Sequence, residues 1–329
     1  MSDKLGALAA KRVSYKHRKR LDTAWLSFVA WSVQFLGIHP EQFEKSCERM
    51  SELLAGYLEF AYSRGKPFSQ GKMAVLAVQD KYRTMRKRLQ KAWDALGTWE
   101  LELPLTMHTP LPPTLMWSLF AVGATMGLAA KGPVARRWLG FAVGCLCMFW
   151  GLMRPGEFYN MTFDDTGVYE CSKRGRTLLL AVKKPKNQRQ MGKRQVAVVQ
   201  NIVAIRWLEW LSESCLPSEP LLRGGRVQFT NCLTTALELL GVPRRLFGPS
   251  SFRSGGATEL YLAGTDMARI RLLGRWKHLN TVDHYVQHAS AVLAQSEIKH
   301  LLPTLRQLLK QTSFLRRPPP WPAAQLFSS

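Results

Sequence analysis

The sequence predicts a mainly α-helical protein with one small antiparallel β-sheet, an α+β fold. Apolar residues recur at helical spacing through residues 21–103, and two long apolar runs follow at Leu115–Ala130 and Trp138–Met153. Two short β-type runs flank a basic loop between residues 177 and 199. With 329 residues, the chain is long enough for two ordinary domains.

Charge indicates the class of partner. The chain has 46 Lys and Arg against 23 Asp and Glu, a net charge of +23 and an isoelectric point near 10.2. Such self-repulsion does not stabilise a fold, and its usual reason is a polyanionic partner, most often nucleic acid. A ribosome-associated or merely basic protein is the alternative.

The N-terminal third predicts a basic segment over residues 1–20, either a flexible arm or the charged start of a helix, and then an all-helical domain over residues 21–103. Helical periodicity places four helices in that domain, closed or interrupted by Gly37, His39-Pro40 and Arg64–Pro67. We expect the basic side chains of the arm and of residues 81–91 to face DNA phosphates, and the aromatic stripe of these helices to form a core.

A proline-rich stretch over residues 104–114 predicts the domain boundary. Its four prolines prevent a helix and favour a stiff, extended linker. The second domain is expected over residues 115–302. Its two apolar runs are each about one turn or more too short for a comfortable membrane span, so buried helices explain them better than a membrane hairpin.

Beyond the apolar runs, the pattern changes to short elements. Residues 161–170 have turn chemistry, while Thr177–Val182 and Gln195–Val199 predict strands joined by a strongly basic loop. Helices are expected at 202–211, 229–239 and about 289–302. The Pro-rich residues 303–329 predict a mobile C-terminal tail.

Residues 250–285 combine an arginine, a tryptophan and a tyrosine, each of which can act on a phosphate. Arg253 offers bidentate charge-assisted hydrogen bonds, Trp276 one indole N–H and Tyr285 a nucleophilic oxygen. A second arginine, in Arg154-Pro-Gly-Glu157, ends the second apolar run. Two arginines, a lysine that protonates the leaving oxygen and an attacking tyrosine suffice for phosphodiester cleavage without a metal.

Together these boxes resemble those of tyrosine recombinases, the phage-integrase family. Arg154-x-x-Glu157 resembles the first arginine box, with Glu157 in support, and Pro185-Lys186-Asn187 fits the hairpin lysine, with Lys183 and Lys184 as alternatives. Arg253 matches the second arginine, and Tyr285 lies nine residues after Trp276, as the nucleophile does in the family. The resemblance covers roughly residues 15–300 and implies a helical core-binding domain followed by an integrase-like catalytic domain.

Two departures from the family pattern stand out. The family has His-x-x-Arg where this chain has Ser250, and a serine cannot act as an imidazole base near neutral pH. One residue, Arg275, is inserted between Gly274 and Trp276. A degraded, domesticated DNA-binding protein is therefore the alternative to an active site-specific recombinase.

The resemblance implies double-stranded DNA as the partner and self-association into a tetramer-like synapse on DNA, with no membrane partner, cofactor or metal. The six cysteines show no zinc-ligand spacing. The residues expected to contact DNA are Lys16, Arg18, Lys19, Arg20, Lys81, Arg86, Lys87, Lys184, Arg189, Lys193 and Arg194.

Overall fold

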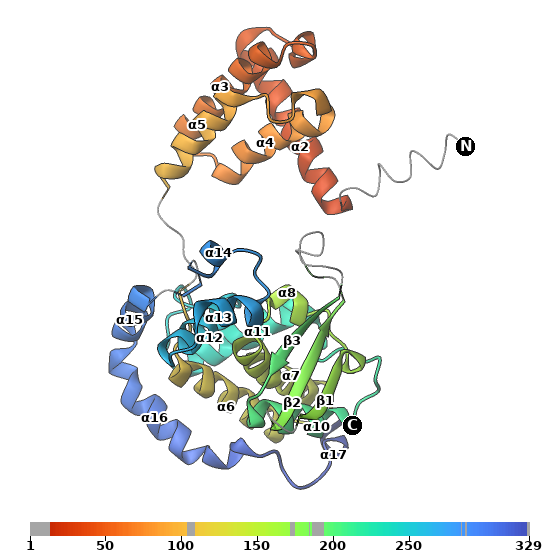
Figure 1. Cartoon of the computed structure of the whole chain (residues 1–329), viewed down its shortest axis with the longest axis vertical. Coiled ribbons are helices and arrows are strands. Elements are labelled where there is room, and N and C mark those ends of the chain that lie inside the picture. The colour runs from red at the N-terminus through yellow and green to blue at the C-terminus, as the bar shows by residue number, and fades with distance from the viewer. Residues whose placement is uncertain are drawn as a thin grey trace, which may run out of the picture. The chain divides into compact units, whose positions relative to one another are not determined.

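The computed structural model describes residues 14–103, 109–171, 175–183, 185, 194–283, 285–286 and 288–327. It divides into two compact units, residues 1–106 and 107–329 (Figure 1). Helices dominate both, and the described strands form one small antiparallel sheet, so the predicted fold class is confirmed. Within the described residues, no helix is long and apolar enough to cross a membrane.

In residues 14–103, the described part of the N-terminal unit, four α-helices form a bundle. Its helices are α2 (Tyr15–Leu36), α3 (Cys47–Ser63), α4 (Phe68–Lys81) and α5 (Gln90–Leu101). Gly37 ends α2 in the left-handed conformation, which glycine adopts without steric cost. Phe28, Tyr57 and Trp99 are buried in the core of the bundle, so its aromatic stripe is core, as expected. Residues 15–20 are the first turns of α2, so this part of the basic segment is the charged start of a helix, the second of the two alternatives.

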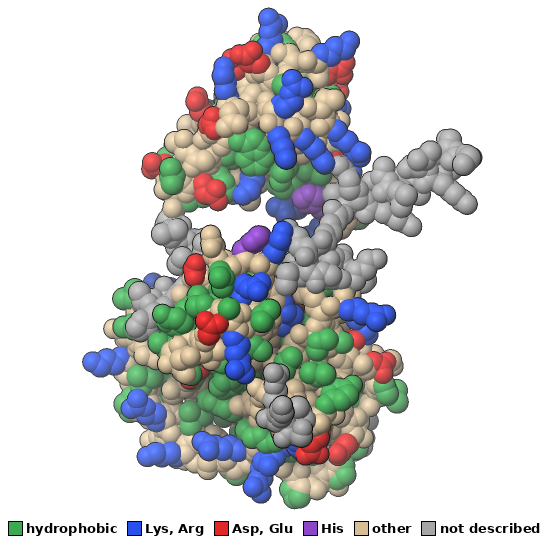
Figure 2. All heavy atoms as spheres, in the orientation of Figure 1, with side chains coloured by type: hydrophobic (Ala, Val, Ile, Leu, Met, Phe, Trp, Pro, Cys, Tyr) green, Lys and Arg blue, Asp and Glu red, His purple; other side chains and the backbone are tan. Residues whose placement is uncertain are grey.

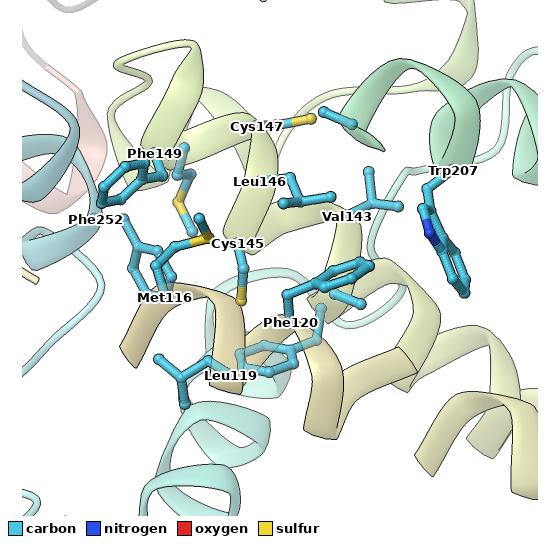
Figure 3. Packing of buried hydrophobic residues seen from close by; sticks show 14 of the residues in the cluster. Met116, Leu119, Phe120, Val143, Cys145, Leu146, Cys147, Phe149, Trp207 and Phe252 are labelled. Atoms are coloured by element: carbon cyan, nitrogen blue, oxygen red, sulfur yellow. The ribbon is translucent and has the colours of Figure 1, made fainter. Parts of the chain in front are cut away.

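The C-terminal unit is built around a buried helix. Helices α6 (Pro113–Ala129) and α7 (Gly132–Trp150) pack against each other as a hairpin, and α10 (Ile202–Ser212), α11 (Gly225–Leu239) and α12 (Ser251–Leu262) contact α7. Figure 3 shows side chains of α6, α7, α10 and α12 meeting in one apolar cluster. The apolar runs therefore form the centre of this core.

The expected linker differs in its second half. Its residues 104–108 lie outside the described residues, but Leu111 is buried against the C-terminal unit and donates its backbone N–H to the Ser251 carbonyl, 3.0 Å away. Pro113 starts α6, because a proline fits the first turn of a helix, where no N–H is needed. Residues 109–114 thus belong to the C-terminal unit.

A three-stranded antiparallel sheet covers one side of these helices (Figure 1). It consists of β1 (Thr166–Cys171), β2 (Gly175–Val182) and β3 (Gln195–Val199), in the order β1-β2-β3. The two predicted strands are found. β1 was expected to be turn, because Asp164, Asp165 and Gly167 dominate its local pattern, whereas pairing with β2 decides the outcome.

Glycines allow α12 to lie against its neighbours without a gap. A Cβ on Gly256 would stand 2.0 Å from the Phe149 carbonyl oxygen of α7, and one on Gly255 would stand 2.3 Å from the Leu111 carbonyl oxygen. Both distances are far below a possible contact. Close approach of α12 to the end of α7 places Arg253 beside the turn that carries Arg154.

The C-terminal segment is folded back on the unit, so the prediction of a mobile tail is wrong. After α15 (His288–Glu297), α16 (Leu302–Gln311) packs against α6 and α17 (Ala324–Phe327) packs against α7. The Trp207 and Trp210 indole N–H groups of α10 donate to the carbonyls of Leu315 and Trp321, each at 2.7 Å. Buried apolar side chains before and after the prolines, such as Leu315 and Leu326, anchor the segment, and composition alone does not reveal them.

Deleting residues 313–329 is expected to destabilise the C-terminal unit strongly. The deletion leaves two buried indole N–H groups without acceptors, at about 1–3 kcal/mol each, and uncovers apolar core. Its thermal transition should fall by about 10 °C or more in a unit of this size, measured by calorimetry of the full chain and the deletion variant. As a control, Phe314→Ala should change little, because Phe314 is 67% exposed. An unchanged thermal transition temperature in the deletion variant would contradict the packing of this segment on the C-terminal unit.

Candidate active site

Three of the predicted boxes converge at one end of the C-terminal unit. Arg154 follows α7 and precedes the short helix α8 (Pro155–Phe158), Arg253 lies in the first turn of α12, and Trp276 follows α13 (Met267–Gly274). Helices α12 and α13 are in contact, and α13 contacts α14 (Leu279–Asp283), which precedes Tyr285. Figure 1 shows α8, α12, α13 and α14 at the same end of the unit.

Arg253 is a buried cation with unused donors. Its side chain is 1% exposed, and one Nη donates to the Gly274 carbonyl. Its Nε and other Nη have no hydrogen-bond acceptor among the residues that the structure describes. Burial lowers the pKa of Arg253 to about 9, with Arg154 and Arg275 adding to the effect, so the guanidinium is still charged at neutral pH. An anion placed here would satisfy both the charge and the free N–H groups.

Two aromatic rings cover this guanidinium. The Arg253 Cζ lies 4.3 Å from the Trp276 ring centroid and 5.3 Å from that of Tyr285, and the two rings are 4.8 Å apart. The buried Trp276 Nε1 also has no acceptor in the described part of the chain. A small apolar cluster that includes Leu152, Ile270 and Val282 holds both rings. Next to the Tyr285 ring, the site therefore gathers three nitrogen donors that have no acceptor among the described residues.

Gly274 makes room for the tryptophan. A Cβ at this position would stand 1.7 Å from a carbon of the Trp276 ring. Packing thus explains why glycine stands at position 274, since the indole lies directly on its Cα. The Gly274 carbonyl then faces Arg253 and accepts its hydrogen bond.

Arg154 is held by Glu157. The Arg154 backbone N–H donates to Glu157 Oε2 at 3.0 Å, and its Nη1 donates to Oε1 at 2.6 Å. Glu157 also accepts from Arg275 Nη2 at 2.8 Å. Burial by itself would raise the pKa of Glu157, but the two arginines outweigh burial and lower it, so the carboxylate is ionised. The cluster of Arg154, Arg253, Arg275 and Glu157 keeps a positive charge.

Ser250 lies at the start of α12, one turn before Arg253. It is partly buried, and its hydroxyl makes no capping hydrogen bond to the described backbone of α12. Positions three apart share a helix face, so Ser250 lies on the same face of α12 as Arg253. It can hydrogen-bond an anion, but it brings no base.

The lysine of the strand hairpin is only partly placed. Lys186, Lys184, Arg189 and Lys193 lie outside the described residues. Lys183, the alternative at the end of β2, is exposed and pairs with Asp165 Oδ1 at 3.0 Å and with Thr162 Oγ1 at 3.2 Å. The buried Asp165 thus gives Lys183 a structural partner at the base of the hairpin, close to the Arg154 turn.

The expected DNA-contacting side chains of the N-terminal unit are at its surface. Lys16, Lys19, Arg86 and Lys87 are exposed, whereas Arg18 pairs with Asp80. Lys81 pairs with Glu41 at 2.9 Å and lies 4.7 Å from the Trp25 ring centroid. Arg20 and, in the C-terminal unit, Arg194 are also exposed. Figure 2 shows Lys and Arg side chains spread over the drawn face of both units.

Sequence reasoning missed the part that Arg275 plays. Its position directly before Trp276 was visible as an insertion, but the bond to Glu157 joins residues 118 positions apart in the chain. The Thr162–Asp165–Lys183 group was missed as well, since its members come from the turn before β1 and the end of β2. Within the described residues, no group of three His, Cys, Asp or Glu side chains could hold a metal ion.

Comparison with known structures gives the fold class of the chain: it is the fold of site-specific recombinases and transposon integrases. The integrase of transposon Tn1549, solved in complex with transposon right-end DNA, matches with a TM-score of 0.54 and 12% identity over 89% of this chain and 98% of that one. The XerH site-specific recombinase, bound to a palindromic difH substrate after cleavage, matches with a TM-score of 0.51 and 15% identity over 75% of this chain and 71% of that one. No family model and no curated protein matches the sequence.

Proposed function

We propose that this protein is a tyrosine-type site-specific DNA recombinase, which cuts and rejoins DNA through a 3′-phosphotyrosyl intermediate. One observation carries the proposal: three nitrogen donors, two of the buried Arg253 guanidinium and one of the Trp276 indole, have no acceptor among the described residues and lie beside Tyr285. A buried cation without an acidic partner is costly unless an anion completes it. A phosphodiester supplies that anion.

In the proposed reaction, Arg154 and Arg253 bind the non-bridging oxygens of the scissile phosphate, and Trp276 donates its indole N–H. The Tyr285 hydroxyl gives its proton to water, and its oxygen forms a bond to phosphorus while the bond to the 5′ oxygen breaks and Lys186 gives that oxygen a proton. The reverse attack by a 5′ hydroxyl rejoins the strand. Because the Tyr285 ring lies over Arg253, this ring must swing aside before the phosphate reaches the guanidinium.

The domain roles follow from the same proposal. The N-terminal bundle is the core-binding domain and the C-terminal unit the catalytic domain, and double-stranded DNA lies against the basic surfaces of both. Most of these contacts go to phosphates, so binding should weaken steeply as salt is raised. Recombination between two sites also requires several copies of the chain to assemble on DNA.

The test is covalent capture. The protein is incubated with nicked duplexes from a DNA pool that it has itself selected by binding, and adducts that survive denaturation are isolated. Mass spectrometry of the adduct should find the DNA on Tyr285. Binding without an adduct, or an adduct on another residue, would contradict the proposed chemistry.

Ser250 favours a second candidate, a degraded integrase-like protein that binds DNA without cutting it. A hydroxyl cannot replace the imidazole that the resemblance predicts at this position. For this candidate we expect tight binding and no adduct from the natural sequence, and adduct formation in Ser250→His. If the unmodified chain forms the adduct, this candidate is excluded and Ser250 is a tolerated departure.

A further inference from the structure

The inserted residue Arg275 connects three segments of the proposed site. Its Nη1 donates to the Gly151 and Leu273 carbonyls, each at 3.3 Å, and its Nη2 donates to the Leu152 carbonyl at 3.3 Å and to Glu157 Oε2 at 2.8 Å. The side chain is therefore bonded to the end of α7, to α8 and to its own helix α13. It is 5% exposed, so these contacts are made away from water.

The backbone of Arg275 is held in an unusual conformation. Its φ and ψ are 57° and 42°, the left-handed region that glycine adopts freely and other residues at a cost. Its N–H closes α13 on the carbonyls of Arg271 and Leu272. Glycine is the residue usually found in this conformation at the end of a helix. The contacts of the arginine side chain therefore offset the conformational cost that glycine would avoid.

The ion pairs of Glu157 also connect Arg275 with the proposed site. Glu157 is the carboxylate that ion-pairs with both Arg154 and Arg275, and it places one oxygen on each guanidinium. Removing Arg275 would leave both oxygens of Glu157 free to pair with Arg154, and a neutralised Arg154 would attract a phosphate less. Arg275 also precedes Trp276, so its ties to Gly151 and Leu152 fix where the indole lies over Arg253.

We propose that Arg275 is a positioning residue of the phosphate site, which orients Arg154 through Glu157 and holds Trp276 against Arg253. The inference rests on the proposed function only in taking the ligand of the site to be a phosphate. It assigns a role to a residue that the family resemblance leaves as an insertion.

Inorganic phosphate is the probe, and thermal stabilisation of the full chain at constant ionic strength is the measurement. Phosphate should stabilise the unmodified protein, and Arg253→Met should abolish this effect. Arg275→Met should weaken the apparent phosphate affinity about tenfold or more, the loss typical when the partner that orients a ligating side chain is removed. Arg275→Lys, which keeps charge and bulk but loses the two-pronged contact, should fall between the two.

Arg136→Met is the matched control. Arg136 is also a buried arginine of this unit, bonded to the Pro220 and Leu221 carbonyls at 2.8 and 2.9 Å, but it makes no contact with the site in the described structure. The Arg136→Met substitution should lower the thermal transition temperature without changing the stabilisation by phosphate. If Arg275→Met likewise lowers the transition temperature but leaves the phosphate affinity unchanged, Arg275 is only structural and the proposal is wrong.

A double-mutant cycle tests the route through Glu157. If Arg275 acts through that carboxylate, Arg275→Met should cost much less affinity when Glu157→Gln is already present, whereas independent roles would add. Additive losses would overturn the proposed route. If phosphate does not stabilise the unmodified protein, or if Arg253→Met keeps the response, the anion site itself is absent. That result would overturn both the proposed function and this inference. If instead only Arg275→Met leaves the phosphate affinity unchanged, the inference is wrong and the proposed function stands.

Discussion

Tyr285→Phe is expected to abolish covalent capture of DNA while leaving DNA affinity unchanged. The substitution removes only the phenolic oxygen, which is the nucleophile in the proposed reaction. The ring contacts with Trp276 and Arg253 persist, because phenylalanine offers the same faces. Adduct on denaturing gels and affinity by titration, measured on the same nicked duplex, check both halves of the prediction.

Tyr261→Phe is the matched control for this experiment. Tyr261 lies on α12 in the same unit and is 43% exposed, so it is accessible to DNA but has no place in the proposed site. It should keep full adduct formation. An adduct that persists in Tyr285→Phe, or one that disappears in Tyr261→Phe, would mean that the nucleophile is wrongly assigned.

Arg253→Met is expected to slow adduct formation by a factor of about 10³ or more, the range in which arginines at phosphoryl-transfer sites act. The transition state gathers negative charge on the phosphate, and the Arg253 Nε and one of its Nη atoms have no competing acceptor in the described part of the chain. The rate under single-turnover conditions, with the protein in excess over the nicked duplex, measures the effect directly.

In Arg253→Met, the thermal stability of the C-terminal unit should not fall together with the rate of adduct formation. Methionine has similar bulk and needs no anion, and replacing buried charge with apolar groups is often neutral or stabilising. Arg253→Met should therefore keep or raise the thermal transition of the C-terminal unit while it loses rate. A large fall in the transition temperature would mean that Arg253 is chiefly structural, contrary to the proposed role.

The sequence predicted the fold class because periodicity is a local property. The helices of the N-terminal bundle, the buried pair α6 and α7, and strands β2 and β3 each carry their pattern within one segment. β1 and the C-terminal segment were missed because contacts with other segments of the chain decide their structure. β1 is fixed by its pairing with β2, and residues 313–327 are fixed by bonds to Trp207 and Trp210 about a hundred residues earlier.

The candidate site shows the same division. Arg154, Arg253, Trp276 and Tyr285 were found as residue types at telling spacings, and the structure brings Arg253, Trp276 and Tyr285 into contact, with Arg154 beside them through Glu157 and Arg275. No spacing rule could indicate that the insertion at 275 reaches Glu157 or that Lys183 is bound to Asp165. The expected catalytic role of Lys186 stays a prediction.

The folded-back C-terminal segment has a consequence for how the chain is made. Helix α7, at the centre of the second unit, leaves the ribosome long before α17, which covers part of it. The two indole N–H groups of α10 likewise have no acceptors until Leu315 and Trp321 have been synthesised. The N-terminal bundle is complete by residue 103 and can fold during synthesis. The second unit must keep a large apolar surface out of aggregates until α17 has been synthesised, so chaperone binding to nascent chains should be concentrated on residues 113–150.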